Sequence, residues 1–498
     1  MTFISRILGF LRDMIVAHVF GATLMTDAFY VAFKIPNLFR RLFAEGSFSQ
    51  AFVPVLSEYK IQRTPEEMRT FINHLAGNLA LILFIFTAVC MVLAPFIVDI
   101  FAPGFANTPE KYDLASTMLR ITFPYLFFIS LTAFAGAILN THSKFAAAAF
   151  NPVLLNIAMI IAALWGAKHF HVPIYALAWG VFFAGIIQLL FLLPHLYRLK
   201  VMPRPQIAWH DPGVKRVLKL MVPALFGVSL AQISILVDTM FASFLVTGSI
   251  SWLYNSERLM EFPLGIFGVA LSTVILPHLS KRFAAKSETE YSNTIEWAIR
   301  AVLVIGLPAM LALIILAGPM LATLLNYGKF NAFDVIMTER SLMAFSIGIP
   351  FFMLVKIFAA SFYARQNVKT PVKIAAIALG VNIALNFALV FSLKHAGLAL
   401  ASSIAAIVNA GSLYFLLRKQ KIYQPVNQTK HFVLRIVIAN IIFAIVLFFM
   451  SPHLQEWLAW RAWHRVGELC LILCVGLIVY FVMLWLLRFK VRDFITKS

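Results

Sequence analysis

Charged side chains recur in this sequence inside stretches that are otherwise apolar. Residues 37–54, NLFRRLFAEGSFSQAFVP, place Arg40, Arg41 and Glu45 among phenylalanine, leucine and alanine. An arginine at the centre of a membrane-spanning helix costs about 2.5–3.5 kcal/mol on insertion scales, so it is kept only where something polar meets it. The charges of this kind fall in three stretches and are Arg6, Arg12, Asp13, Asp27, Lys34, Arg40, Arg41, Glu45, Glu257, Arg258 and Glu261.

The residue types at these positions favour an anionic ligand. Arginine outnumbers lysine there, and its planar guanidinium binds phosphate through two parallel hydrogen bonds and stays charged when it loses water. At 100° per residue, Arg6 and Asp13 share one helix face. Glu257, Arg258 and Glu261 form a stripe of both signs along one side of their helix. We therefore expect these side chains to line a water-filled cavity that binds a phosphate-bearing substrate.

Two other interpretations of the same charges remain open. The arginines nearly equal the acidic residues in number, so the two signs could pair and hold helices together without any substrate. Arg40 and Arg41 could instead extend along their helix until the guanidinium groups reach the membrane surface. Composition alone does not separate these interpretations from an anion-binding cavity.

The elements that would position these residues are membrane-spanning helices. Of the 498 residues, 61% are hydrophobic and 12% are charged, and the mean hydropathy is +0.87. Apolar blocks of about 20 residues, long enough for a helix to cross the hydrocarbon core, recur along the whole chain. The sequence therefore predicts an all-α polytopic membrane protein with about fourteen transmembrane helices. The expected helices begin near Met1, Met25, Phe71, Leu114, Lys144, Ile174, Val214, Ile250, Tyr291, Phe333, Thr370, Gly397, His431 and Arg465.

The second of these helices is too long for a single straight span. Residues 25–58 would extend about 50 Å as one helix, well beyond the thickness of the hydrocarbon core. The helix must therefore bend, break or protrude from the membrane. We expect the break at Glu45, Gly46 and Ser47.

The distribution of positive charge indicates the orientation in the membrane. The formal net charge of +20 could suggest a nucleic-acid partner, but lysine and arginine gather near every second loop. Cytoplasmic loops of membrane proteins carry this excess, so we expect both termini in the cytoplasm and no nucleic-acid partner. The three cysteines, Cys90, Cys470 and Cys474, lie in apolar helices without a second pair that would complete a metal site, so we expect them to pack as apolar residues.

A short motif occurs twice, about half the chain apart. Residues 49–59, SQAFVPVLSEY, and residues 272–282, STVILPHLSKR, share the frame S-x-x-x-x-P-x-L-S ahead of a basic loop. Such a repeat predicts a duplicated six-helix unit. We expect an N-terminal lobe at residues 1–200 and a C-terminal lobe at residues 213–420, with the proline-rich stretch 197–216 as their connector. Two additional helices at residues 430–490 would extend a lipid-facing surface.

Five stretches of the sequence carry a resemblance to one known family. The chain is very similar there to the MurJ (MviN) lipid II flippases, which belong to the superfamily that includes multidrug exporters and polysaccharide flippases. The stretches are SRILGFLRDMIVAHVFGA (residues 5–22), TDAFYVAFKIPNLFRRLFAEGSFSQAFVPVLSEYK (26–60), ERLMEFPLGIFGVALSTVILPHLSK (257–281), YGKFNAFD (327–334) and ARQNVKTPVKIA (364–375).

The resemblance implies two six-helix lobes around a cationic cavity, and two further helices that form a groove for a polyprenyl tail. It also implies that the chain is no enzyme but a monomeric transporter in contact with membrane lipids. Its expected function is to flip lipid II, a polyprenyl diphosphate-linked disaccharide peptide, by alternating access from the cytoplasmic to the outer leaflet of the bacterial inner membrane. The residues implied for binding the diphosphate are Arg6, Arg12, Arg40 and Arg258, surrounded by Ser5, Asp13, Asp27, Ser251 and Glu261, and Arg41 joins them as the neighbour of Arg40.

Some members of that family bind sodium through a carboxylate on the seventh span and polar groups on the eleventh and twelfth. Asp238, Asn382, Asn386 and Ser402 are similar in placement and form a candidate cation site. Asn386 is an amide where those members have a second carboxylate, and the lost charge should weaken a site for a hard cation. The alternative is that the two asparagines form hydrogen bonds between helices. We expect no cofactor, and sodium, protons or the membrane potential could drive the cycle.

Three other functions compete with lipid II flipping. A cation-coupled multidrug exporter would be favoured if the carboxylates, rather than the arginines, dominate the cavity. A flippase for another polyprenyl-linked oligosaccharide would use the same chemistry. A membrane glycosyltransferase typically needs acidic residues on a sizeable outer loop, whereas the outer loops here are short and Glu110 with Asp113 is the only close acidic pair among the early ones.

Overall fold

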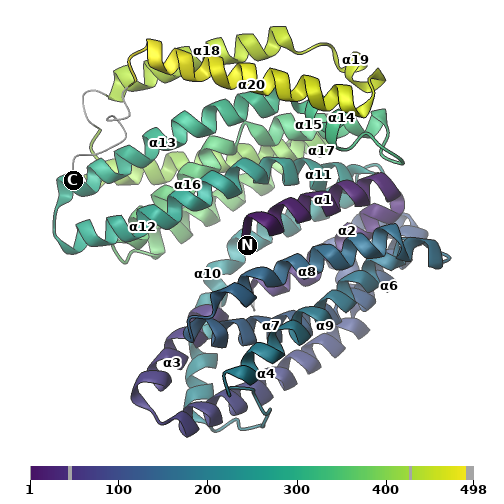
Figure 1. Ribbon diagram of the computed structural model, residues 1–498, viewed down its shortest axis with the longest axis vertical. Coiled ribbons are helices and arrows are strands. Elements are labelled where there is room, and N and C mark those ends of the chain that lie inside the picture. The colour runs from purple at the N-terminus through teal and green to yellow at the C-terminus, as the bar shows by residue number, and fades with distance from the viewer. Residues whose placement is uncertain (1, 43–47, 426–428, 490–498) are drawn as a thin grey trace. The chain divides into compact units, whose positions relative to one another are not determined.

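The computed structural model describes residues 2–42, 48–425 and 429–489, and every regular element in these ranges is helical (Figure 1). Ten segments of this described part are long and apolar enough to cross a membrane. The predicted total of about fourteen is reached when α17 (Lys369–Lys419) counts as two spans and three further spans are added. These are α1 (Thr2–Phe20), the pair α2 (Leu24–Phe39) and α3 (Ser49–Gln62), and α10 (Pro212–Ser243). The predicted all-α polytopic fold is confirmed.

The chain forms two compact units, Met1–Ser251 and Trp252–Ser498. In unit 1, α2 packs against α6, while α8 packs against both α1 and α9. Helix α9 also contacts α7, and α10 contacts α3. The remaining elements of unit 1 are α4 (Pro65–Val92), α5 (Ala94–Phe101), the 3-10 turn η2 (Pro103–Asn107), α6 (Pro109–Thr122), α7 (Pro124–Thr141), α8 (Phe145–Leu164), the 3-10 turn η3 (Gly166–His169) and α9 (Tyr175–Arg198).

Unit 2 is built around α13, which contacts α15, α16 and α18. Helices α18 and α20, the predicted additional pair, lie side by side along this unit (Figure 1). Its elements are α11 (Ser249–Pro263, whose first turn belongs to unit 1), the π-helical turn η4 (Leu264–Gly268), α12 (Val269–Ala284), α13 (Glu288–Ile315), α14 (Ala317–Leu324), α15 (Ala332–Ser346), α16 (Ile349–Tyr363), α17, α18 (Thr429–Met450), α19 (Leu454–Ala459) and α20 (Ala462–Leu486).

Side-chain caps fix where several helices begin. Thr23 caps α2 and Thr64 caps α4, and in each case the third residue of the helix returns a hydrogen bond to the cap. Such reciprocal caps satisfy amide groups that the first helical turn leaves without partners. The cap at Thr23 therefore fixes the orientation of the first turn of α2, which carries Asp27.

Two π-helical segments interrupt the long helices. The predicted break at Glu45, Gly46 and Ser47 lies outside the described residues, but residues 40–42 and Phe48 on its two sides are π-helical. The turn η4 joins α11 to α12 in the same way. Each π-helical segment precedes one copy of the repeated motif, which lies in α3 and in α12. Insertions of this kind bend a helix and are frequent at functional sites.

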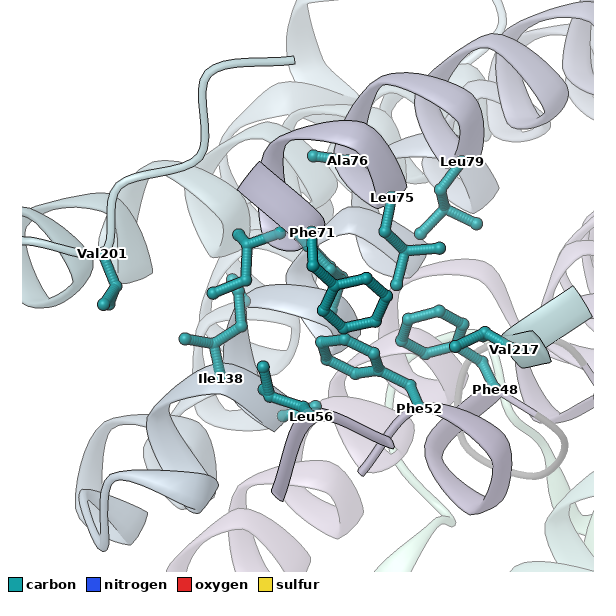
Figure 2. Close-up of a cluster of buried hydrophobic side chains, with 14 of the residues drawn as sticks. Phe48, Phe52, Leu56, Phe71, Leu75, Ala76, Leu79, Ile138, Val201 and Val217 are labelled. Carbon is teal, nitrogen blue, oxygen red and sulfur yellow. The ribbon is translucent and has the colours of Figure 1, made fainter. Parts of the chain in front are cut away.

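The connector is bound to unit 1. Val201 and Val217 lie in the same buried cluster as the aromatic rings of Phe48, Phe52 and Phe71 (Figure 2). This cluster joins α3, α4 and α7 to the start of α10. The connector and the start of α10 therefore pack as part of unit 1.

The main chain of the connector is also held by α4. The amide nitrogens of Arg204 and Gln206 donate to the side chain and the carbonyl of Asn73, at 2.7 and 3.0 Å. The amide of Ala208 donates to Asn78 Oδ1 at 3.2 Å. Every second residue of an extended chain turns its N–H to the same side, so three alternate amides can meet one helix.

Candidate functional site

Arg12 and Asp13 form a buried ion pair at the contact between α1 and α8. The guanidinium of Arg12 donates to Asp13 Oδ1 from Nε at 2.9 Å and from Nη2 at 2.6 Å, and the two residues are only 3% and 4% exposed. Arg12 Nη1 also donates to Asn156 Oδ1 at 3.1 Å, and Asn156 Nδ2 donates to the carbonyl of Ser5 at 3.1 Å. The pair is net neutral, so much of the cost of burying either charge is offset.

Three other predicted arginines of unit 1 are more accessible. Arg6 is exposed, and Arg40 and Arg41 are half-buried. Arg40 Nε donates to Asn37 Oδ1 at 3.0 Å, one helical turn earlier. Arg40 and Arg41 both lie in the π-helical residues that follow α2, so this backbone insertion sets the direction of their side chains.

In unit 2, Arg258 is held by two neighbours on α11. Its Nη1 lies 3.2 Å from Glu261 Oε2, and its Nε donates to the hydroxyl of Tyr254 at 3.3 Å. The side chains of Arg258 and Glu261 are 33% and 39% exposed. The predicted stripe on this helix therefore includes a direct contact between its acid and its base.

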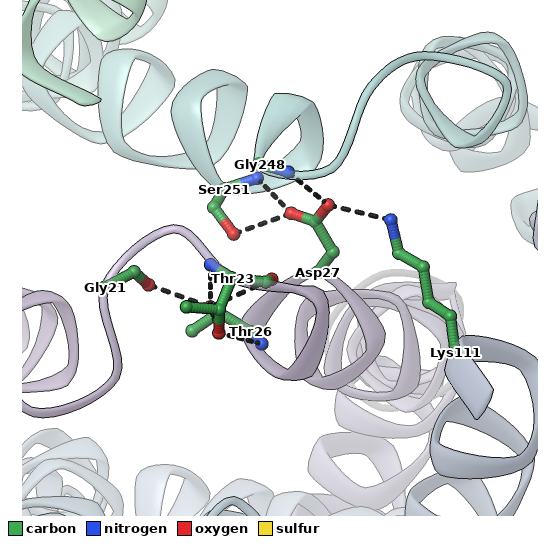
Figure 3. A network of polar contacts seen from close by, with 7 residues as sticks. All are labelled: Gly21, Thr23, Thr26, Asp27, Lys111, Gly248 and Ser251. Atoms are coloured by element: carbon green, nitrogen blue, oxygen red, sulfur yellow. Dashed lines mark hydrogen bonds and ion pairs between the residues drawn. The ribbon is translucent and has the colours of Figure 1, made fainter. Parts of the chain in front are cut away.

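Asp27 binds the first turn of α11 (Figure 3). Its Oδ1 accepts hydrogen bonds from the amide and the hydroxyl of Ser251, at 2.9 and 2.7 Å. Its Oδ2 accepts from the amide of Gly248 at 2.8 Å and from Lys111 Nζ at 2.9 Å. Gly248 has a φ of 99°, which a residue with a side chain rarely adopts. Asp27 is fully buried, and it meets the positive end of the α11 dipole.

Lys111 is a functional candidate that the sequence analysis missed. It lies in a polar stretch, PEKYD (residues 109–113), which gives no sign that the lysine is buried. The structure buries it at 4% exposure, with its ammonium 2.9 Å from Asp27 and 4.5 Å from the centre of the Phe105 ring. The requirement that a buried carboxylate have a cation near it was the one available signal.

The amide cluster of the candidate cation site is partly assembled in unit 2. Asn382 Nδ2 donates to Ser402 Oγ at 3.2 Å, and Asn386 Nδ2 donates to Asn382 Oδ1 at 3.3 Å. These groups carry no charge and bond to one another, so they fit interhelical hydrogen bonding better than a hard cation. Asp238 belongs to unit 1. Within the described ranges, no group of three or more His, Cys, Asp or Glu could hold a metal ion.

The chain matches known proteins over nearly its whole length. The family model described as lipid II flippase MurJ matches residues 16–464. The probable lipid II flippase MurJ of Haemophilus influenzae is 43% identical, with 100% of each chain covered. The lipid II flippase MurJ of Burkholderia cenocepacia is 42% identical over 99% of this chain and 96% of that protein.

Solved structures show the same relationship. A lipid II flippase MurJ in an inward closed conformation has a TM-score of 0.82 and 28% identity, over 97% of this chain and 96% of that one. A multidrug resistance MATE family transporter has a TM-score of 0.69 at 14% identity, over 84% of this chain and 95% of that one, and shares the fold. The matches along the whole sequence and the whole fold agree, and the chain belongs to the lipid II flippase MurJ family.

Proposed function

We propose that this protein flips lipid II from the cytoplasmic to the outer leaflet of the bacterial inner membrane. The observation that carries the proposal is the family match, which extends over nearly the whole chain in sequence and in fold. The protein is a multi-pass membrane protein that transports rather than transforms its substrate. We further propose that it acts as a monomer with both termini in the cytoplasm.

The arginines supply what the substrate's head group needs. A diphosphate cannot enter hydrocarbon without a large desolvation cost, and guanidinium groups can replace its water with charge-assisted hydrogen bonds. Of the arginines named as candidates, Arg6 is exposed and Arg40 and Arg41 are half-buried in unit 1, and Arg258 is partly exposed in unit 2. Arg12, which is already paired with Asp13, would act mainly by holding α1 on α8.

Glu261 would return Arg258 to its resting state. Arg258 contacts Glu261 in the structure, and an incoming diphosphate would displace this carboxylate because it carries more charge. When the substrate leaves on the outer side, the carboxylate takes its place again. Arg258 would therefore keep an anionic partner throughout the cycle.

Asp27 would hold the outer side closed. Transport by alternating access requires a contact that forms in one state and breaks in the other. The three hydrogen bonds from Gly248 and Ser251 to Asp27 would serve as such a contact, since all three end on one carboxylate. Their release would free the first turn of α11 from α2.

The membrane potential is the driving force that we propose. A charge that moves across the whole membrane gains about 2.3 kcal/mol per 100 mV. Asn386 would offer a hard cation an amide rather than a carboxylate, which gives sodium coupling less support. Full transport in de-energised vesicles would contradict this choice.

Cells depleted of their own flippase test the function directly. Without a flippase, lipid II stays on the cytoplasmic leaflet, and expression of this chain should move it to the outer leaflet. The Arg258→Ala variant, expressed at the same protein level, should not. The matched control is Arg216→Ala, because Arg216 forms an exposed pair with Glu58. Rescue by Arg258→Ala, or no rescue by the unchanged chain, would count against the proposal.

A further inference from the structure

We propose that Lys111 is a positioning residue for transport: it keeps Asp27 neutralised, so that this carboxylate can hold residues 248–251 and then release them without opposing an anionic substrate. The inference rests on the proposed function for its last step only. Its first step, the coupling of Lys111 to residues 248–251 through Asp27, stands on the contacts themselves (Figure 3).

The bonds to Asp27 divide into two kinds. Gly248 and Ser251 bring neutral donors, two amides and one hydroxyl. Lys111 brings a full positive charge, 2.9 Å from Oδ2. For a buried carboxylate with only neutral partners, most of the desolvation cost remains uncompensated. Beside a buried ammonium the same group forms a neutral pair, and the attraction between the two charges offsets part of that cost.

The position of Lys111 is unfavourable for a lysine that has no specific partner. It lies in the first turn of α6, where the helix dipole disfavours positive charge. It is also buried against Phe105 rather than extended into solvent. Contact with Asp27 accounts for both features, which a lysine serving only solubility or topology would not show.

Helices α2 and α6 would carry the pair as one body. The two helices pack together, and Thr122 Oγ1, at the opposite end of α6 from Lys111, donates at 2.9 Å to the carbonyl of Ala32, which lies just over one helical turn after Asp27. Residues 248–251 belong to a different segment and meet Asp27 only through their first helical turn. When this turn leaves, Asp27 keeps its counter-ion, and an anionic head group passes a neutral pair instead of a bare carboxylate.

A reporter cysteine can measure the release of the segment. Ser249 is fully buried in the same turn, so Ser249→Cys should react with a membrane-impermeant maleimide only after the turn has left Asp27. The background is the full-length chain with Cys90, Cys470 and Cys474 changed to serine, expressed in cells depleted of their own flippase. Lipid II export and thermal stability are measured on the same variants.

Each single charge change should release the turn. Lys111→Met and Asp27→Asn should both raise the maleimide reaction rate, by about tenfold or more, because each leaves a buried charge unpaired. Lys111→Arg should stay near the parent rate. Asp27→Asn combined with Lys111→Met should recover part of the way to the parent rate, since no charge then needs a partner. Lys168→Met, an exposed outer lysine on η3, is the matched control and should change nothing.

The outcomes separate a positioning role from a structural one. If Lys111 only supports the fold, Lys111→Met should lower the thermal stability. Adding Asp27→Asn to it should then not bring the maleimide reaction rate back toward that of the parent. Parent-like labelling and export in Lys111→Met, or a double variant at least as reactive as Lys111→Met, would overturn the proposal. If the labelling pattern holds but the unchanged chain exports no lipid II, the proposed function fails and the coupling stands.

Discussion

At the scale of single residues, the polar side chains of the membrane helices act in pairs. Glu261 and Arg258 hold each other at 3.2 Å on one helix face, and both remain partly exposed. An exposed pair of this kind contributes only about 0.2–1 kcal/mol. A weak, reversible pair is what a transporter needs at a site that must both bind and release an anion.

Glu261→Gln should therefore change binding and turnover in opposite directions. The loss of the competing carboxylate should tighten lipid II binding about twofold to fivefold, and the slower reset of Arg258 should lower the export rate. Binding is measured on purified protein and export in flippase-depleted cells. Glu58→Gln removes an exposed acid of the Arg216 pair and serves as the control. Unchanged export in Glu261→Gln would contradict the proposed reset.

The Arg12–Asp13 pair leads to a prediction about stability. Asp13→Asn leaves the Arg12 guanidinium buried without its carboxylate, which should destabilise the protein by about 3–5 kcal/mol. Asn156→Ala removes one further hydrogen bond to the same guanidinium and should cost only about 1 kcal/mol. Thermal unfolding in detergent compares the two variants. Equal effects would mean that the ion pair adds little to the contact between α1 and α8.

Sequence reasoning located the charged residues of the site but not most of their partners. Asp27 and Arg258 were found because charge contrasts with apolar surroundings. Lys111 was missed, since its partner lies 84 positions away and belongs to another helix. The neighbour pair of Arg12 with Asp13 was also not foreseen, because helical periodicity places adjacent residues on different faces. Long side chains can overcome that difference.

At the scale of helices, the expected starts were close for the apolar spans. Helix α15 begins at Ala332 and α17 at Lys369, beside the predicted Phe333 and Thr370. The segment α17 consists of two helices that meet at a kink at Lys394, where φ is 53° and ψ is −130°, so both of the predicted spans are present. The docking of the connector on α4 could not be foreseen, because prolines and charges signal a loop without indicating what it contacts.

Gly77 gives a test of that docking. A Cβ atom at this position would lie 2.3–2.6 Å from the main chain of Gln206, and backbone cannot move aside as a flexible side chain can. Gly77→Ala should therefore displace the connector and lower the melting temperature, although alanine favours helix by up to about 1 kcal/mol. Gly380→Ala is the matched control, because nothing lies within 4 Å of its added Cβ.

Gly77→Ala and Gly380→Ala should differ in their effect on the melting temperature. Gly380→Ala should leave the melting temperature unchanged or raise it, and should leave the connector resistant to protease at Arg204. In Gly77→Ala, cleavage at Arg204 should become faster. A Gly77→Ala protein as stable and as resistant as the unchanged chain would show that the connector does not need this contact.

At the scale of the whole molecule, transport requires its parts to move, and a connector between two lobes, as residues 197–216 are expected to be, could serve as a hinge. Its three contacts with α4 and the burial of Val201 instead make it part of unit 1. Any relative motion of the units Met1–Ser251 and Trp252–Ser498 must then be taken up outside the connector.

A cross-link between the connector and α4 should therefore leave transport intact. Asn78→Cys with Ala208→Cys replaces two residues that already meet through a hydrogen bond of 3.2 Å, and a short thiol cross-linker would make this contact permanent in the cysteine-free background. Lipid II export before and after cross-linking should agree within about twofold, because the bond restrains residues that move together. Reduction of the cross-link controls for chemical damage, and each single cysteine controls for the substitution. If cross-linking stops export and reduction restores it, the connector is the hinge after all, and the fixed contact with α4 describes only one state of the transport cycle.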